Sequence, residues 1–181
     1  MTYIPALTLE SVDPALRVSL EAVQRKLGVL PNMVRTLAHT PVALNAYLKL
    51  SDVAGSGKLS AGQREQIALI VGESNDCGYC VAAHGVIGTM VGLTPAQIEQ
   101  ARHGRSEQAG DAAVLTLARR IVEARGHVPT AELDAFKAAG FDDAAILEVL
   151  VSVVLNIFTN YTNHLARTEI DFPVVPKALA A

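Results

Sequence analysis

The order of apolar and polar positions along the chain follows the periodicity of helices. Apolar residues recur every three or four positions through most of the sequence, as they do on one face of an amphipathic helix. No stretch of useful length alternates apolar and polar residues in the way of a half-buried strand. The pattern therefore predicts an all-helical protein.

Capping residues, prolines and glycines indicate where these helices begin and end. We expect an extended N-terminal arm over residues 1–12 and a C-terminal tail over residues 168–181, which contains Pro173 and Pro176. The expected helices between them are 14–27, 31–40, 41–53, 60–73, 77–92, 94–103, 111–125, 130–139 and 142–167. A chain of this length fits one domain. We therefore predict a single all-helical domain over residues 1–181.

The segment 65–84 holds both cysteines of the chain, Cys77 and Cys80, and the other helices are expected to bury it. The polar turn 74–76 separates two helical stretches, which predicts a two-helix hairpin with the dithiol at the start of its second helix. Cysteines three residues apart on a helix share a face and can close a disulfide. The start of a helix also favours the thiolate, which is the reactive form of cysteine.

Two further side chains of this hairpin have the chemistry of a proton relay. His84 follows Cys80 by four residues, so its imidazole can reach the sulfur and take or return a proton. Glu65 is expected to lie level with His84 across the hairpin, where its carboxylate would orient the imidazole. Glu73 is the alternative partner, since it lies closer to the dithiol, but we expect it to be a solvated residue at the helix end.

These residues have the spacing of a known active-site motif, namely Glu, eleven residues, Cys-x-x-Cys, three residues and His. In this spacing, and in its last helix and Asp-Phe-Pro tail, the chain resembles the peroxidase-related branch of the alkylhydroperoxidase D-like, carboxymuconolactone decarboxylase superfamily. The resemblance implies an AhpD-like fold, a multi-helix orthogonal bundle around the hairpin. It also implies a thiol-dependent peroxidase that reduces alkyl hydroperoxides, in which Cys80 attacks the peroxide, Cys77 resolves it, and Glu65 with His84 relays protons.

The same resemblance suggests partners and leaves one departure to explain. It points to trimers or hexamers and to a lipoyl or other dithiol carrier as reductant, with no cofactor. Well-known peroxidase members carry a histidine between the two cysteines, where this chain has Tyr79. A weaker relay or a different substrate would be consistent with that change.

Three alternatives to a peroxidase can be set against these residues. A non-enzymatic redox sensor could use the dithiol as a switch, and the sequence does not separate it from a peroxidase. A lactone decarboxylase or isomerase of the same superfamily is disfavoured, because that branch generally does not need the dithiol. A zinc site made of Cys77, Cys80, His84 and Glu65 is disfavoured because structural zinc prefers more thiolates than this chain contains. We expect no metal.

The expected last helix is apolar almost all round, apart from one narrow polar stripe. Polar residues recur there at four-residue spacing, namely Glu148, Ser152, Asn156, Asn160 and His164. We favour a solvent-facing edge, or side chains that bond neighbouring helix ends across a subunit interface. The alternative is a stripe that faces the active-site cavity.

Composition and charge narrow the possible partners and location. Half of the 181 residues are apolar, which is high for a soluble monomer, so we expect a homo-oligomer. The net charge of −3 and the lack of a basic run give no reason to expect nucleic-acid binding. We count no apolar stretch long enough to span a bilayer and find no signal peptide, and therefore expect no membrane contact. A close pair of cysteines favours a cytoplasmic redox pair.

Overall fold

The computed structural model describes residues 1–173, and helices are the regular elements of this part of the chain. In chain order they are α1 (Pro14–Leu27), α2 (Asn32–Leu37), α3 (Pro41–Gly55), α4 (Ala61–Ser74), α5 (Gly78–Met90), α6 (Pro95–Arg102), α7 (Ala109–Glu123), α8 (Thr130–Ala138) and α9 (Asp143–Ala166). The predicted all-helical class is confirmed, and most ends agree within two residues. Pro176, in the predicted tail, lies outside the described residues.

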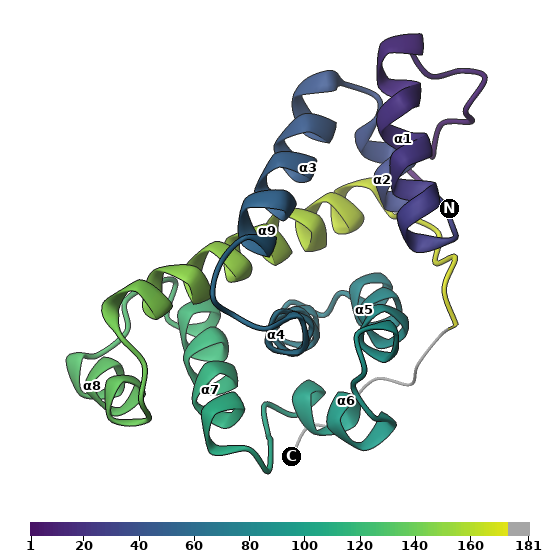
Figure 1. The fold of residues 1–181 in the computed structure, drawn as a ribbon. Helices are drawn as coiled ribbons and strands as arrows, with labels where there is room; N and C mark the ends of the chain where they lie inside the picture. Colours follow the sequence, from purple (N-terminus) through teal and green to yellow (C-terminus); the bar gives the residue numbers. More distant parts are fainter. Residues whose placement is uncertain (174–181) are drawn as a thin grey trace.

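Helix α4 lies at the centre of the fold. Figure 1 shows it almost end-on, with α5, α6, α7 and α9 arranged around it, and these are the helices that it contacts. Its sequence explains this place, because every residue from Gln66 to Gly72 is buried. A helix that is buried all round belongs to the core of its protein. This central helix also carries Glu65, so one side chain of the predicted relay stands on the most enclosed element.

Helix α9 fixes both ends of α4 through the polar stripe. The carboxylate of Glu148 accepts hydrogen bonds from the backbone N–H groups of Lys58 and Leu59, at 2.7 and 3.1 Å, just before α4 begins. At the other end, the side-chain amide of Asn75, the residue that caps α4, donates to Oδ1 of Asn160 at 2.9 Å. These bonds connect α9 to the residues that lie just before and just after α4.

The favoured interpretation of the stripe is therefore wrong for its middle part. Ser152, Asn156 and Asn160 are buried inside this chain, whereas His164 is exposed. The side chains do bond the ends of a neighbouring helix, but that helix is α4 of the same chain. The helices packed on the stripe come from distant parts of the chain, so the local pattern does not reveal them.

Two separate groups of buried apolar residues hold the helices together. The first cluster joins α4, α7 and α9 and includes Leu69, Val114, Leu115, Val149 and Val153. The second cluster joins the N-terminal arm, α1, α2, α3 and α5, and includes Leu16, Leu20, Met33, Val34 and Leu44. Cys77, Tyr79 and Cys80 belong to the second cluster, so the dithiol is part of a hydrophobic core.

The two ends of the described chain meet beside α2. The backbone N–H groups of Tyr3 and Ile4 donate to the carbonyl of Ala166, at 2.8 and 3.1 Å, where α9 ends. After α9, the carboxylate of Asp171 accepts a 2.8 Å hydrogen bond from the N–H of Asn32 at the start of α2. The arm and the segment after α9 are thus anchored to the helices that enclose the dithiol.

Helix α9 also corrects the expectation that no stretch could cross a membrane. By length and composition alone, Asp143–Ala166 is apolar enough to do so, and it is the one helix of the described residues that passes this test. The expectation was wrong because it required an unbroken apolar run. The mean hydropathy of this helix is high although the helix contains serine, threonine and asparagine. One such helix is weak evidence for a membrane span, since the core helix of a soluble protein passes the same test, and α9 packs against α2, α3, α4 and α7.

Candidate active site

The turn between α4 and α5 sets the position of the dithiol. After α4, Asp76 adopts the left-handed conformation with a φ of 58°. The N–H of Asp76 donates to the carbonyl of Glu73, and the N–H of Cys77 donates to the carbonyl of Gly72 at 2.8 Å. This is the Schellman arrangement, which satisfies the last carbonyls of a helix while it reverses the chain. Cys77 therefore follows the turn directly and caps the start of α5.

Close packing of α4 against α5 brings the second cysteine under the first helix. A Cβ on Gly72 would lie 3.2 Å from Cγ2 of Val81 and 3.5 Å from Cβ of Cys80. The first distance is tighter than ordinary van der Waals contact, so a glycine here allows the approach of the two helices. The sequence places Gly72 on the predicted hairpin but does not reveal this contact, because the contact depends on the crossing of the helices.

The two cysteines are joined as a disulfide at the start of α5. Their Cα atoms are 5.3 Å apart, and Sγ of Cys77 accepts a 3.3 Å hydrogen bond from the N–H of Cys80. Both residues are only 2% exposed. The predicted pairing is thus present in the structure, whereas its reversibility stays a prediction.

Glu65 and His84 form a direct contact across the hairpin. Nδ1 of His84 lies 2.7 Å from Oε2 of Glu65, and the two side chains are 22% and 16% exposed. The register is the one that an antiparallel hairpin predicts. Within residues 1–173 no hydrogen bond joins His84 to either sulfur, although Cys80 and His84 share a face of α5. The roles of these residues in catalysis stay a prediction.

Glu73, the alternative carboxylate, has a different partner. Its Oε1 lies 2.6 Å from Nε of Arg102 on α6, and the side chains of Glu73 and Arg102 are 13% and 5% exposed. The expectation that Glu73 is a solvated helix-end residue is therefore wrong, because α6 covers it. It does not contact His84 among the described residues, which leaves Glu65 as the carboxylate that orients the imidazole.

Tyr79, between the two cysteines, links the dithiol turn to both ends of the chain. Its hydroxyl donates to Oδ1 of Asp171 at 2.8 Å and accepts from the N–H of Met33 at 3.1 Å, and its ring packs edge-on against Phe172. Burial, together with the hydrogen bond to Asp171, raises the pKa of Tyr79 far above its usual range. The hydroxyl therefore stays protonated and can act as the donor.

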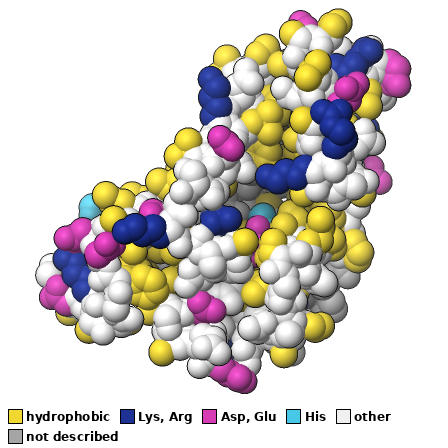
Figure 2. Space-filling model, viewed as in Figure 1, with side chains coloured by type: hydrophobic (Ala, Val, Ile, Leu, Met, Phe, Trp, Pro, Cys, Tyr) yellow, Lys and Arg dark blue, Asp and Glu magenta, His cyan; other side chains and the backbone are white. Residues whose placement is uncertain are grey.

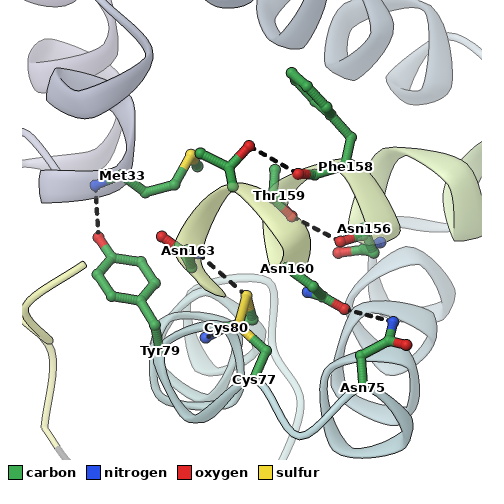
Figure 3. The surroundings of a disulfide bond; sticks show 11 residues. Met33, Asn75, Cys77, Tyr79, Cys80, Asn156, Phe158, Thr159, Asn160 and Asn163 are labelled. Carbon is green, nitrogen blue, oxygen red and sulfur yellow. Dashed lines mark hydrogen bonds between the residues drawn. A yellow bond between two sulfur atoms is a disulfide. The ribbon is translucent and has the colours of Figure 1, made fainter. Parts of the chain in front are cut away.

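Two residues near the site were missed by the sequence reasoning as functional candidates. Tyr47 on α3 packs against the second cluster, and burial and then the charge of Glu65 raise its pKa to about 12. Asn163 on α9 donates from Nδ2 to Sγ of Cys80 at 3.3 Å (Figure 3). Asn163 lies beside the polar stripe, one residue before His164, so an analysis of both faces of the last helix could have found it.

The surface near the site is hollowed, and a separate groove lies behind Tyr79. Figure 2 shows a hollow between α1 and α3 above and α4 and α5 below, with basic side chains at its rim and a histidine and an acidic side chain inside it. A groove of about 560 Å³ lies between the N-terminal arm, α2 and residues 168–171. Neither cysteine lines this groove, but Asp171 does. The groove is therefore connected to Tyr79 through the hydrogen bond between Tyr79 and Asp171.

The donor set for zinc is not assembled. In the part of the chain that the structure describes, no group of three or more His, Cys, Asp and Glu side chains lies close enough to hold a metal ion. The two sulfurs bond to each other, and Glu65 and His84 form their own contact.

At the level of sequence, part of the chain is similar to one known protein family. The model of the carboxymuconolactone decarboxylase family matches residues 41–124, which include Glu65, Cys77, Cys80 and His84. Among curated proteins, none matched the chain by sequence.

Solved structures show the same fold over almost the whole chain. The alkylhydroperoxidase AhpD core of an uncharacterized peroxidase-related protein from Ralstonia eutropha JMP134 aligns with a TM-score of 0.86 and 25% identity, covering 94% of this chain and 92% of that one. An uncharacterized peroxidase-related protein from Silicibacter sp. TM1040 aligns with a TM-score of 0.81 and 25% identity, covering 92% and 91%.

A third solved structure shows that this fold is used for more than one reaction. The debrominase Bmp8, in complex with 2,3,4-tribromopyrrole, has a TM-score of 0.81 and 19% identity, covering 94% of this chain and 92% of that one. At this identity the likeness shows the fold alone. Residues 41–124, which contain the Glu, Cys-x-x-Cys and His motif, match the carboxymuconolactone decarboxylase family, and the chain as a whole is similar in fold to the peroxidase-related proteins.

Proposed function

We propose that this protein is a thiol-dependent peroxidase that reduces alkyl hydroperoxides with the Cys77 and Cys80 dithiol. The observation that carries the proposal is the joint placement of a disulfide-forming pair and a hydrogen-bonded Glu65–His84 pair on one helical hairpin. A peroxidase needs a nucleophile, a resolving thiol and a group that delivers a proton to the leaving alkoxide. The hairpin supplies each of these.

The reaction would proceed in three balanced steps. The Cys80 thiolate attacks the outer oxygen of the hydroperoxide, the O–O bond breaks, and the leaving alkoxide takes a proton from the Glu65–His84 pair to become an alcohol. Cys80 is then a sulfenic acid, and the Cys77 thiol displaces its hydroxyl as water while the disulfide forms. An external dithiol, by analogy a lipoyl or related carrier, reduces the disulfide and restores both thiols.

The buried surroundings of the dithiol support this order of events. Both cysteines lie in the second cluster, which holds apolar side chains from four helices and the arm. Such a site admits an organic peroxide more readily than a large, charged reductant, so reduction requires the hairpin region to open or the carrier to be small. Cys80 is assigned as the attacking thiol because it shares the face of α5 that carries His84.

Steady-state consumption of cumene hydroperoxide with excess dithiothreitol tests the proposal. The wild-type protein should consume many equivalents of peroxide per chain, and Cys80→Ser should consume none. Without dithiothreitol, Cys77→Ser should consume about one equivalent and keep Cys80 as the sulfenic acid. Consumption of a single equivalent by the wild type, with no turnover, would instead favour the redox sensor. Conversion of a lactone acid by Cys80→Ser would favour the decarboxylase or isomerase, because that reaction does not need the dithiol.

We further propose that the protein is a homo-oligomer, a trimer or a hexamer, that uses α9 as an interface. Apolar side chains that stay exposed in the single chain form one stripe along this helix, at Leu147, Leu150, Val154, Tyr161 and Leu165. Their spacing of three, four, seven and four residues keeps them on one face. An apolar patch of this kind on a soluble protein marks an interaction site.

Sedimentation of a charged variant tests this interface. Val154 is 47% exposed, and Val154→Glu should shift the protein toward the monomer at micromolar concentration. Val18 on α1 is a matched control, because it is 66% exposed but lies outside the stripe, and Val18→Glu should leave the assembly unchanged. A wild-type protein that sediments as a monomer would contradict the proposal.

We propose a cytoplasmic location, because a dithiol that turns over requires a supply of reductant.

A further inference from the structure

The sulfur of Cys80 receives a hydrogen bond from a side chain that the peroxidase motif does not contain. Nδ2 of Asn163 lies 3.3 Å from Sγ of Cys80, and both residues are at most 5% exposed. Asn163 lies on α9, 83 residues after Cys80 in the sequence. Figure 3 shows its amide pointing from α9 toward the disulfide.

The surroundings of Cys80 make such a donor necessary for a thiolate. Cys80 is 2% exposed and packed among apolar residues of the second cluster, and burial among apolar groups disfavours a charged sulfur. The backbone N–H of Cys80 points to Cys77, whose sulfur it reaches at 3.3 Å. Within residues 1–173, Asn163 is the residue whose side chain donates a hydrogen bond to Cys80 itself.

The geometry of α9 holds the amide in place. The backbone carbonyl of Asn163 accepts from the N–H of Thr168 at 3.1 Å as the helix ends, which fixes the last turn. Among residues 1–173 the side chain makes no other hydrogen bond, and its Oδ1 is buried without a partner there. A disulfide or thiolate sulfur has no proton to donate, so the nitrogen, not the oxygen, must face it.

We propose that Asn163 stabilises the thiolate of reduced Cys80 by donating a hydrogen bond to its sulfur, and thereby makes Cys80 reactive at neutral pH. This inference rests on the proposed function only in that it names Cys80 as the nucleophile. The thiolate itself can be measured without a peroxide. A donor to a charged group contributes more than a donor to a neutral one, so the effect should be large enough to detect.

Alkylation of a single cysteine by iodoacetamide measures this effect directly. In a Cys77→Ser background Cys80 is the only cysteine, so the rate of alkylation against pH reports its thiolate alone. Asn163→Leu keeps a similar volume but has no donor, and should slow alkylation near neutral pH by about 3- to 10-fold, because a more basic thiolate regains part of the loss through higher nucleophilicity. Its midpoint should move to higher pH.

Two more variants separate this role from a structural one. Asn163→Asp has the same shape and, once its carboxyl ionises, places a negative charge at the sulfur, so above that pH it should slow alkylation more than Asn163→Leu. Asn160→Ala is the matched control: Asn160 lies one turn away on α9 and is also buried, but its Oδ1 accepts from Asn75, so the pH profile should not move. Circular dichroism establishes that each variant is folded.

Each outcome decides the question. A pH profile that moves for both Asn163 variants and not for Asn160→Ala supports the proposal. A profile that is the same in Asn163→Leu and in its parent, or an equal shift in Asn160→Ala, overturns it. If the profile moves as expected but the wild type turns over no peroxide, the proposed function has failed and the role of Asn163 stands. If peroxide turns over and the profile does not move, the reverse holds.

Discussion

The two hydrophobic clusters differ in how they are built and in what they contain. The first cluster is made by α4, α7 and α9 from apolar side chains such as Leu115, which is fully buried. The second cluster encloses a disulfide and the hydroxyl of Tyr79, and it is closed by the N-terminal arm and by the segment that follows α9. A core that serves only stability can be uniform, whereas a core that surrounds a reactive pair needs specific polar partners for each polar atom.

The variants with the largest expected effect remove the proposed proton relay beside the second cluster. Glu65→Gln and His84→Gln should each slow peroxide turnover by about 10²–10⁴-fold, which corresponds to roughly 3–5 kcal/mol, because the leaving alkoxide loses its proton donor. Their combined effect should be much smaller than the product, since the two side chains act as one unit through their 2.7 Å contact. Steady-state kinetics of the two single variants and the double variant measure this. Additive losses would mean that the two residues act separately.

The second variant affects the first cluster alone. Leu115→Ala should lower the free energy of unfolding by about 2–5 kcal/mol, because a fully buried leucine leaves a cavity. Turnover per folded molecule should not change, since Leu115 contacts neither the dithiol nor the relay. Chemical denaturation measures the stability, and Val18→Ala, at a position that is 66% exposed, is the control with an expected change within about 0.5 kcal/mol. A loss of turnover in folded Leu115→Ala would show that the clusters are coupled.

The contrast between the clusters also explains which features the sequence could predict. Helical periodicity and capping residues gave the helices and the hairpin, and hairpin geometry gave the contact between Glu65 and His84, because each depends on neighbours in the chain. The bond from Asn163 to Cys80 and the cover of Arg102 over Glu73 depend on how distant helices cross. The pattern around a single residue does not contain that information. The polar stripe of α9 was visible, but which helix it faces was not.

Tyr79→Phe tests how far the second cluster depends on its polar partners. The change removes a hydroxyl that accepts from Met33 and donates to Asp171, at 3.1 and 2.8 Å, and leaves both groups without it. The free energy of unfolding should fall by about 1–3 kcal/mol. Hydrogen exchange at the Met33 amide should become faster. Tyr47→Phe is the matched control, because the hydroxyl of Tyr47 makes no hydrogen bond within residues 1–173 and its removal therefore breaks none there. Equal losses in both variants would assign the effect to the ring environment instead of the hydrogen bonds.

Glu73→Gln is expected to have only a small effect on turnover, and it separates the two carboxylates of α4. Glu73 lies nearer to the dithiol in sequence than Glu65, but its partner is Arg102, which is also bound by Glu99 at 2.8 Å. Glutamine keeps the shape and an oxygen that can accept from Nε of Arg102, so the bond survives while the charge is lost. Turnover should stay within about twofold of wild type, because positioned acid–base groups are the ones that contribute about 10²–10⁴-fold. A loss of turnover in Glu73→Gln as large as in Glu65→Gln would mean that α6, through Arg102, controls the site, and that the relay extends beyond the hairpin.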